Sequence, residues 1–163
     1  MSRSPFLVNV ADLSRPRAAP RRIELEAPVT WSVDLSRVLA DPPLTASLQL
    51  ARTSGGLVVT GSAGVRAEHT CYRCLSQIQD DVHVEIAQLF VAASVDDDDG
   101  DYVLEGDELD LQPMLRDEVL LAMPLLPVCG DDCAGLPEGV ALESDDAAST
   151  EGSPFEALKD LFE

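Results

Sequence analysis

The sequence predicts an α+β fold: a twisted antiparallel sheet, curved as a partial barrel, packed against one main helix and carrying a four-cysteine knuckle of the metal-binding type. Three observations predict it. The length of 163 residues suits one domain with an ordinary core. Apolar residues make up 45% of the chain but aromatic residues only 4%, so aliphatic side chains must fill the core. Finally, several segments alternate polar and apolar residues, whereas one has helical spacing.

The predicted strands follow from alternation with a period of two, which places every second side chain on one face. Residues 22–26 and 45–51 alternate in this way, and Ser54-Gly55-Gly56 predicts the turn of a hairpin that returns over residues 57–69. A further short strand is expected at residues 102–104. The strands expected to form the sheet are residues 6–10, 22–26, 45–51, 57–69 and 82–91.

One helix is predicted over residues 112–122. Asp110 provides an acidic cap, Pro113 falls in the first turn, and Pro124 ends the helix. Apolar residues at positions 111, 115, 119 and 122 form one stripe, which we expect to pack against the sheet. The predicted core includes Leu48, Leu50, Val59, Val84, Ile86, Leu115 and Val119.

Charge divides the chain into regions. Residues 1–22 have a net charge of +4 and the remainder −23, which together give −19. This balance argues against a protein that coats nucleic acid by neutralising phosphates, and it favours basic partners. We expect a basic N-terminal strand and arm (1–22), a core domain (23–143), a disordered acidic linker (144–153) and a short amphipathic helix (154–163). The arginines expected to contact RNA or a partner are Arg15, Arg17, Arg21, Arg22 and Arg73.

The sequence argues against a membrane protein and against an enzyme. No stretch approaches 18 uncharged apolar residues and no secretory signal is evident, so a cytoplasmic location is expected. It contains no nucleophile elbow, phosphate-binding glycine loop or dinucleotide fingerprint. Only His69 and His83 could act as bases near neutral pH, and His83 is expected on a solvated strand face.

The four cysteines form two pairs: Cys71 with Cys74, and Cys129 with Cys133. Such short spacings let both sulfurs of a turn reach one ion, and four thiolates make a closed tetrahedral Zn²⁺ site of the structural kind. Disulfides are disfavoured in a reducing cytoplasm. The spacing favours zinc, but reduced thiols without metal, or a redox pair of Cys71 and Cys74, remain open.

Around these cysteines the sequence resembles the YceD family of bacterial and plastid proteins, which are linked to accumulation of the large-subunit 23S ribosomal RNA. The first signature is an acidic residue, Glu68, followed by Cys-Xaa-Arg-Cys-Leu at residues 71–75. The second is a series of Asp-Leu, Pro, Arg-Asp, Leu-Leu, Pro and Pro over residues 110–127, ending at the second cysteine pair. Residues 132–136 are similar to the actinobacterial branch, and Pro-Phe-Glu-Ala-Leu at residues 154–158 is similar to the family's C-terminal segment.

The resemblance implies a non-enzymatic ribosome-biogenesis factor that supports accumulation or processing of 23S ribosomal RNA and assembly of the large subunit. A basic large-subunit ribosomal protein or an assembly factor is the expected partner, because the acidic body suits a basic protein better than bare RNA. Two alternatives stay open. One is a small cytoplasmic redox or metal-handling protein that uses Cys71 and Cys74, and the weaker one is a mimic of nucleic acid.

Overall fold

The structure is a computed structural model, and it describes residues 4–13, 15, 18–92, 102–104 and 106–136. The predicted linker 144–153 and the predicted helix 154–163 lie outside the described residues, as does Arg17. The elements are β1 (Leu7–Asn9), β2 (Arg21–Ala27), β3 (Ser32–Val33), β4 (Ser36–Val38), β5 (Leu44–Thr53), β6 (Gly56–Thr70), β7 (Gln77–Ala92), β8 (Tyr102–Leu104), β9 (Glu108–Asp110) and α1 (Gln112–Leu121).

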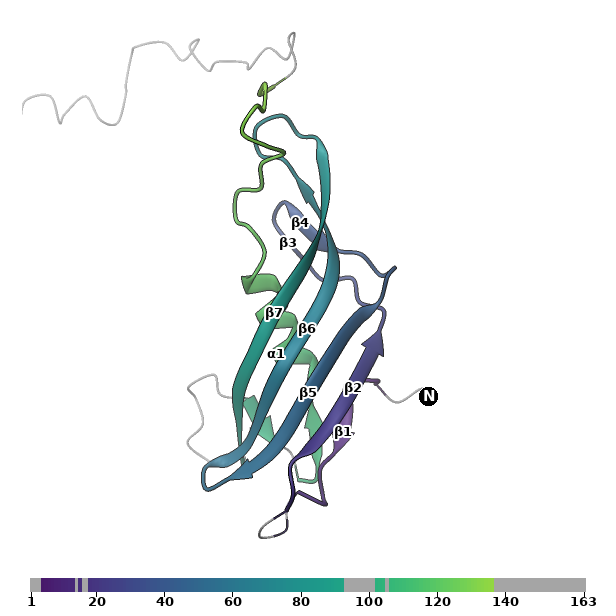
Figure 1. Ribbon diagram of the computed structural model, residues 1–163, viewed down its shortest axis with the longest axis vertical. Coiled ribbons are helices and arrows are strands. Elements are labelled where there is room, and N and C mark those ends of the chain that lie inside the picture. Colours follow the sequence, from purple (N-terminus) through teal and green to yellow (C-terminus); the bar gives the residue numbers. More distant parts are fainter. Residues whose placement is uncertain (1–3, 14, 16–17, 93–101, 105, 137–163) are drawn as a thin grey trace, which may run out of the picture.

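The main sheet is built around the long strand β6 (Figure 1). One edge of β6 pairs first with β5 and then, nearer its end, with β4, while its other edge pairs with β7. Beyond β5 lies β2, which forms one outer edge of the sheet, and beyond β4 lies β3. All these pairings are antiparallel except that of β7 with β8, which is parallel.

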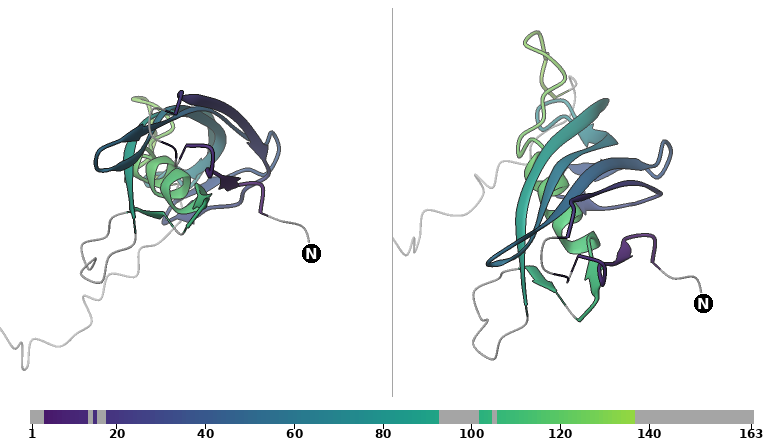
Figure 2. Two further views of the ribbon diagram at one scale, coloured as in Figure 1. Left: turned by 90° about the horizontal axis from the view of Figure 1, so that it is seen from below. Right: turned by 60° about the horizontal axis from the view of Figure 1, so that its bottom comes forward.

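The sheet curves around α1, which lies in its concave face (Figure 2). Leu111, Leu115 and Val119 are fully buried there, as the predicted stripe requires, and Met114 is buried beside them. All seven predicted core residues are buried. Ala122 is exposed, because the helix ends at Leu121 and Ala122 is its C-cap. The N-cap is Leu111, and Asp110 instead accepts a hydrogen bond from the N–H of Gln112 at 2.9 Å.

One expectation about the sheet was wrong. The first predicted strand is not part of it: β1 pairs with β9 in a separate two-stranded ribbon, and the N–H of Leu111 donates to the carbonyl of Phe6 at 3.1 Å. Buried Phe6 and Val10 flank β1 and hold this ribbon at the start of α1. The curved sheet stays open, because the outer strands β2 and β8 do not pair with each other in the described part of the chain.

The described helix has ten residues, and no helix in this part of the chain is long and apolar enough to span a membrane.

Gly61 lies opposite Leu48 of β5, at a position where the neighbouring strand leaves no room for a side chain. Its φ of +148° lies in a region that favours glycine, and a Cβ added there would overlap the carbonyl oxygen of Ser47. Gly55, in the adjoining hairpin turn, has more room: a Cβ there would lie 3.8 Å from Leu89 Cδ2. The two glycines therefore differ in what a methyl group would meet.

We predict that Gly61→Ala lowers the free energy of unfolding by about 2–4 kcal/mol, through backbone strain and the clash with β5. Gly55→Ala, the matched control, should change it by about 0.5 kcal/mol or less. Urea denaturation of both variants measures the difference. Equal effects would contradict the close approach of the two strands.

Candidate metal centre

The turn between β6 and β7 and the segment after α1 meet at one end of the molecule (Figure 1), and these two segments carry the four cysteines. Cys71 and Cys74 lie in the turn between β6 and β7, and Cys129 and Cys133 lie in the segment that follows α1. The structure thus brings together two pairs that are 55 residues apart along the chain. They come together because β6 and β7 extend past the sheet and the segment after α1 runs toward their tip.

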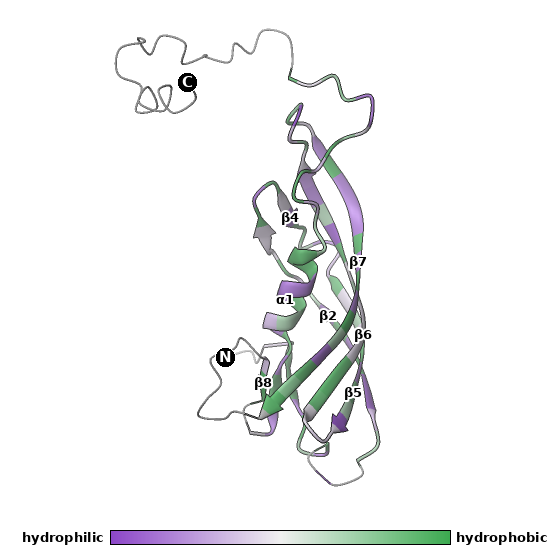
Figure 3. Ribbon diagram, turned by 90° about the vertical axis from the view of Figure 1, so that its left-hand side faces the viewer, coloured by the Kyte–Doolittle hydropathy of each residue, from purple (hydrophilic) through white to green (hydrophobic). Residues whose placement is uncertain are grey.

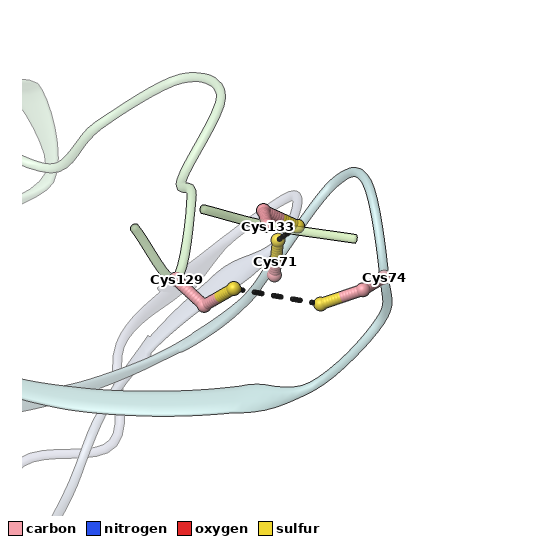
Figure 4. A group of neighbouring side chains, drawn as sticks. All are labelled: Cys71, Cys74, Cys129 and Cys133. Atoms are coloured by element: carbon pink, nitrogen blue, oxygen red, sulfur yellow. Dashed lines mark hydrogen bonds between the residues drawn. The ribbon is translucent and has the colours of Figure 1, made fainter. Parts of the chain in front are cut away.

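The sulfur positions match a four-coordinate thiolate site (Figure 4). All four Sγ atoms lie within 4.8 Å of one another, with Cys71 to Cys133 at 3.8 Å and Cys74 to Cys129 at 3.6 Å. A disulfide bond would need about 2.05 Å. Four sulfurs placed tetrahedrally at about 2.3 Å from one ion lie about 3.8 Å apart. The arrangement can therefore hold one metal ion, with every position taken by sulfur.

A tight turn presents the first pair. The N–H of Cys71 donates to the carbonyl of Ser76 at 2.8 Å, and the N–H of Leu75 donates to the carbonyl of Cys71 at 2.9 Å. Leu75 closes this turn with a φ of +61°, a left-handed conformation that is uncommon for a residue with a branched side chain. This conformation follows directly after Cys74 and turns the chain back into β7.

The second pair is held against the first by backbone hydrogen bonds. The N–H of Tyr72 donates to the carbonyl of Pro127 at 2.9 Å, which joins the two cysteine loops. Within the second loop, the N–H of Cys133 donates to the carbonyl of Gly130 at 3.2 Å. Backbone hydrogen bonds therefore hold the two cysteine loops against each other without a metal ion.

The electrostatics of the four thiols are uneven. Backbone N–H groups of Cys74, Arg73 and Cys129 stabilise the Cys71 thiolate and lower its pKa to about 6. The hydroxyl and N–H of Ser76 lower the pKa of Cys74. By contrast, the neighbouring sulfurs of Cys133 and Cys74 raise the pKa of Cys129 to about 12. The first thiol of the cluster to ionise therefore loses its proton easily, and the last one does so with difficulty, because the negative charges of the thiolates repel one another. A bound divalent cation would offset this repulsion.

The arginines expected at a contact surface have different surroundings. Arg15 and Arg22 are exposed. Arg21 is half-buried, and its guanidinium pairs with Asp12 at 2.9 Å and donates to the carbonyl of Asn9 at 2.7 Å. The Arg73 guanidinium is exposed and forms no hydrogen bond or ion pair with the described residues.

Sequence reasoning missed the role of His69, which lies two residues before Cys71. Its side chain is 2% exposed, with Nδ1 at 2.7 Å from the Ser36 hydroxyl and Nε2 at 2.8 Å from an Asp80 carboxylate oxygen. Both ring nitrogens are thus engaged, and the ring joins β4, β6 and β7 beneath the cysteines. The period of two along β6 could have indicated this, because it places His69 on the same face as Val65 and Ala67, and all three residues are buried. His83 is exposed, as expected.

Comparison with known proteins gives three results. A sequence model of the family described as "Large ribosomal RNA subunit accumulation protein YceD" matches residues 59–162. Uncharacterized proteins of Mycobacterium bovis and Mycobacterium tuberculosis are each 31% identical over 154 residues, covering 87% of this chain and 73% of theirs. One of Mycobacterium leprae is 26% identical over 141 residues, covering 82% of this chain and 64% of its own.

No solved structure matches the chain. The family match covers well over half of the chain, and it includes both cysteine pairs, β7 and α1. The mycobacterial relatives extend the similarity to most of the remaining residues. This chain belongs to the YceD family of large ribosomal RNA subunit accumulation proteins.

Proposed function

We propose that this protein is a non-enzymatic factor for assembly of the large ribosomal subunit, one that supports accumulation or processing of 23S ribosomal RNA. Membership of the YceD family carries this proposal, since the family is described by its role in accumulation of the large ribosomal RNA. The cysteine cluster is consistent with a structural role. All four coordination positions would be sulfur, which leaves no open position for a catalytic water.

The partner in this proposal is a basic ribosomal protein or assembly factor rather than bare RNA. Beyond residue 22 the chain has a net charge of −23. Exposed acidic side chains stand on the outward face of the sheet, including Glu24 and Glu26 on β2 and Glu85 on β7. Arg21, one of the arginines available for phosphate contacts, is already paired within the fold. Electrostatic attraction therefore favours a cationic partner.

For the cysteine centre we propose one structural Zn²⁺ held by Cys71, Cys74, Cys129 and Cys133. Soft thiolate ligands in tetrahedral geometry select zinc among the common divalent ions. The two loops that carry the ligands bury little apolar surface: Leu125, Leu126 and Val128 are all exposed. An ion would supply the cross-link that packing does not, and it would close a long loop of the unfolded chain.

The redox alternative fits this site less well. A reactive dithiol needs an accessible thiolate, as well as a lowered pKa. Cys71 has the lowered pKa but is fully buried. Two further thiols also lie within 4.8 Å of the Cys71–Cys74 pair, a surplus that a two-thiol mechanism does not use.

We predict that Cys74→Ser abolishes stoichiometric zinc binding and lowers the melting temperature, because three thiolates and a hydroxyl hold zinc poorly. Arg73→Gln is the matched control, since it lies in the same turn with an exposed side chain, and it should keep one zinc per chain. Elemental analysis and thermal unfolding measure both. Wild-type protein with an intact fold and well under one zinc per chain would contradict the proposal.

We also predict that zinc is released as the pH falls. The ligand sulfurs must be deprotonated to bind, so protons compete with the ion at low pH. Affinity should fall steadily below neutral pH, and binding should release protons into a weakly buffered solution. A chromogenic zinc chelator titrated at several pH values measures this. Affinity that does not change between neutral and mildly acidic pH would argue against thiolate ligands.

Depletion of the protein in its host should lower the amount of mature 23S relative to 16S ribosomal RNA, because large-subunit assembly would lose a supporting factor. RNA electrophoresis and sucrose-gradient ribosome profiles measure this. Wild-type protein should restore the ratio. An unchanged ratio together with a normal profile would overturn the proposed function, whatever the metal content.

A further inference from the structure

The second half of α1 leaves an apolar groove that the sheet does not cover. The groove has a volume of about 550 Å³, and its walls come from β3, β8, the end of α1 and the segment after it. Leu121 and Leu125, which line it, are 82% and 80% exposed. Figure 3 shows that the end of α1 consists of hydrophobic residues. Two leucines this exposed at one groove indicate a site where another apolar group binds.

We propose that residues 154–163 of this same chain form a short amphipathic helix that docks in this groove. Phe155, Leu158 and Phe162 recur at intervals of three and four residues, and Leu161 lies beside them. On a helix these four side chains occupy one face, which is how amphipathic helices fill apolar grooves. The match to the YceD family extends to residue 162 and so includes most of this segment and every residue that lines the groove except Val33.

The chain is long enough to place the segment there. Leu125 and Leu136 are eleven residues apart, so they are separated by no more than about 40 Å. Residues 137–153 can span about 56 Å when extended. The segment can therefore return from the end of the described chain to the groove. Because both parts belong to one chain, the local concentration of the segment at the groove is high.

Charge favours the same occupant. Of the described residues that line the groove, only Asp117 is charged. Its ion pair with Arg116 is exposed and 3.4 Å long, and pairs of that kind contribute little. Lys159 is the chain's only lysine, and on a helix it flanks the apolar face at Phe155. Docking would bring Lys159 toward Asp117, while the acidic residues of the segment would face solvent.

Hydrogen exchange of the full-length protein, followed by mass spectrometry, tests this docking. In the wild type, amides of residues 154–163 should exchange at least about tenfold more slowly than in the double variant Leu121→Ser with Leu125→Ser. Leu126→Ser is the matched control, because Leu126 is 65% exposed next to Leu125 but does not line the groove. It should leave the protection unchanged. Unchanged exchange in β6 and β7 verifies that each variant is folded.

A charge reversal tests the proposed ion pair between Lys159 and Asp117. Lys159→Glu should weaken the protection, and adding Asp117→Lys should restore part of it. Equal and rapid exchange in the wild type and the groove variant would overturn the proposal and leave the groove to another protein. Protection that increases with protein concentration would also overturn it, in favour of a second copy. If the reversal restores nothing, Asp117 is not the partner of Lys159.

Discussion

The antiparallel pairing of β6 with β7 is the interaction on which the rest of the structure depends. It runs without interruption from Leu57 opposite Phe90 to Thr70 opposite Gln77. Every other strand of the main sheet joins one of these two, directly or through a neighbour, and α1 packs on their concave side. The same pairing positions Cys71 and Cys74, because the turn that carries them is the one that connects the two strands.

Along this hairpin, the means of stabilisation changes from one end to the other. Near α1 the inward side chains are apolar, and Val59, Ile86 and Phe90 are buried in the core. Farther along, where the helix ends, the inward positions are held by His69 and Cys71. Hydrogen bonds between His69 and both Ser36 and Asp80 take the place there of the burial of aliphatic surface. A two-stranded ribbon that extends beyond the core buries too little apolar surface to be stable on its own.

The sequence predicts the parts of this fold that have a strong local period. Four of the five strands expected in the sheet, the short strand at residues 102–104 and the helix are present, although β7 begins at Gln77, five residues before its predicted start. The pairing of β1 with β9 was not predictable, because three-residue strands far apart in sequence carry no pattern that identifies their partners. Likewise, cysteine spacing indicated the meeting of the two pairs, but the turn at Leu75 and the bonds of His69 depend on tertiary context.

The outer strand β2 has a consequence for how the molecule behaves in a crowded solution. An unpaired strand edge invites another chain to extend the sheet, which is a route to aggregation. Here Pro20 and Pro28 bracket the strand and withhold two backbone donors, and its outward positions carry Arg22, Glu24 and Glu26. A second copy adding in antiparallel register would have to accommodate this charged row. The edge is thereby kept available to solvent rather than to other chains.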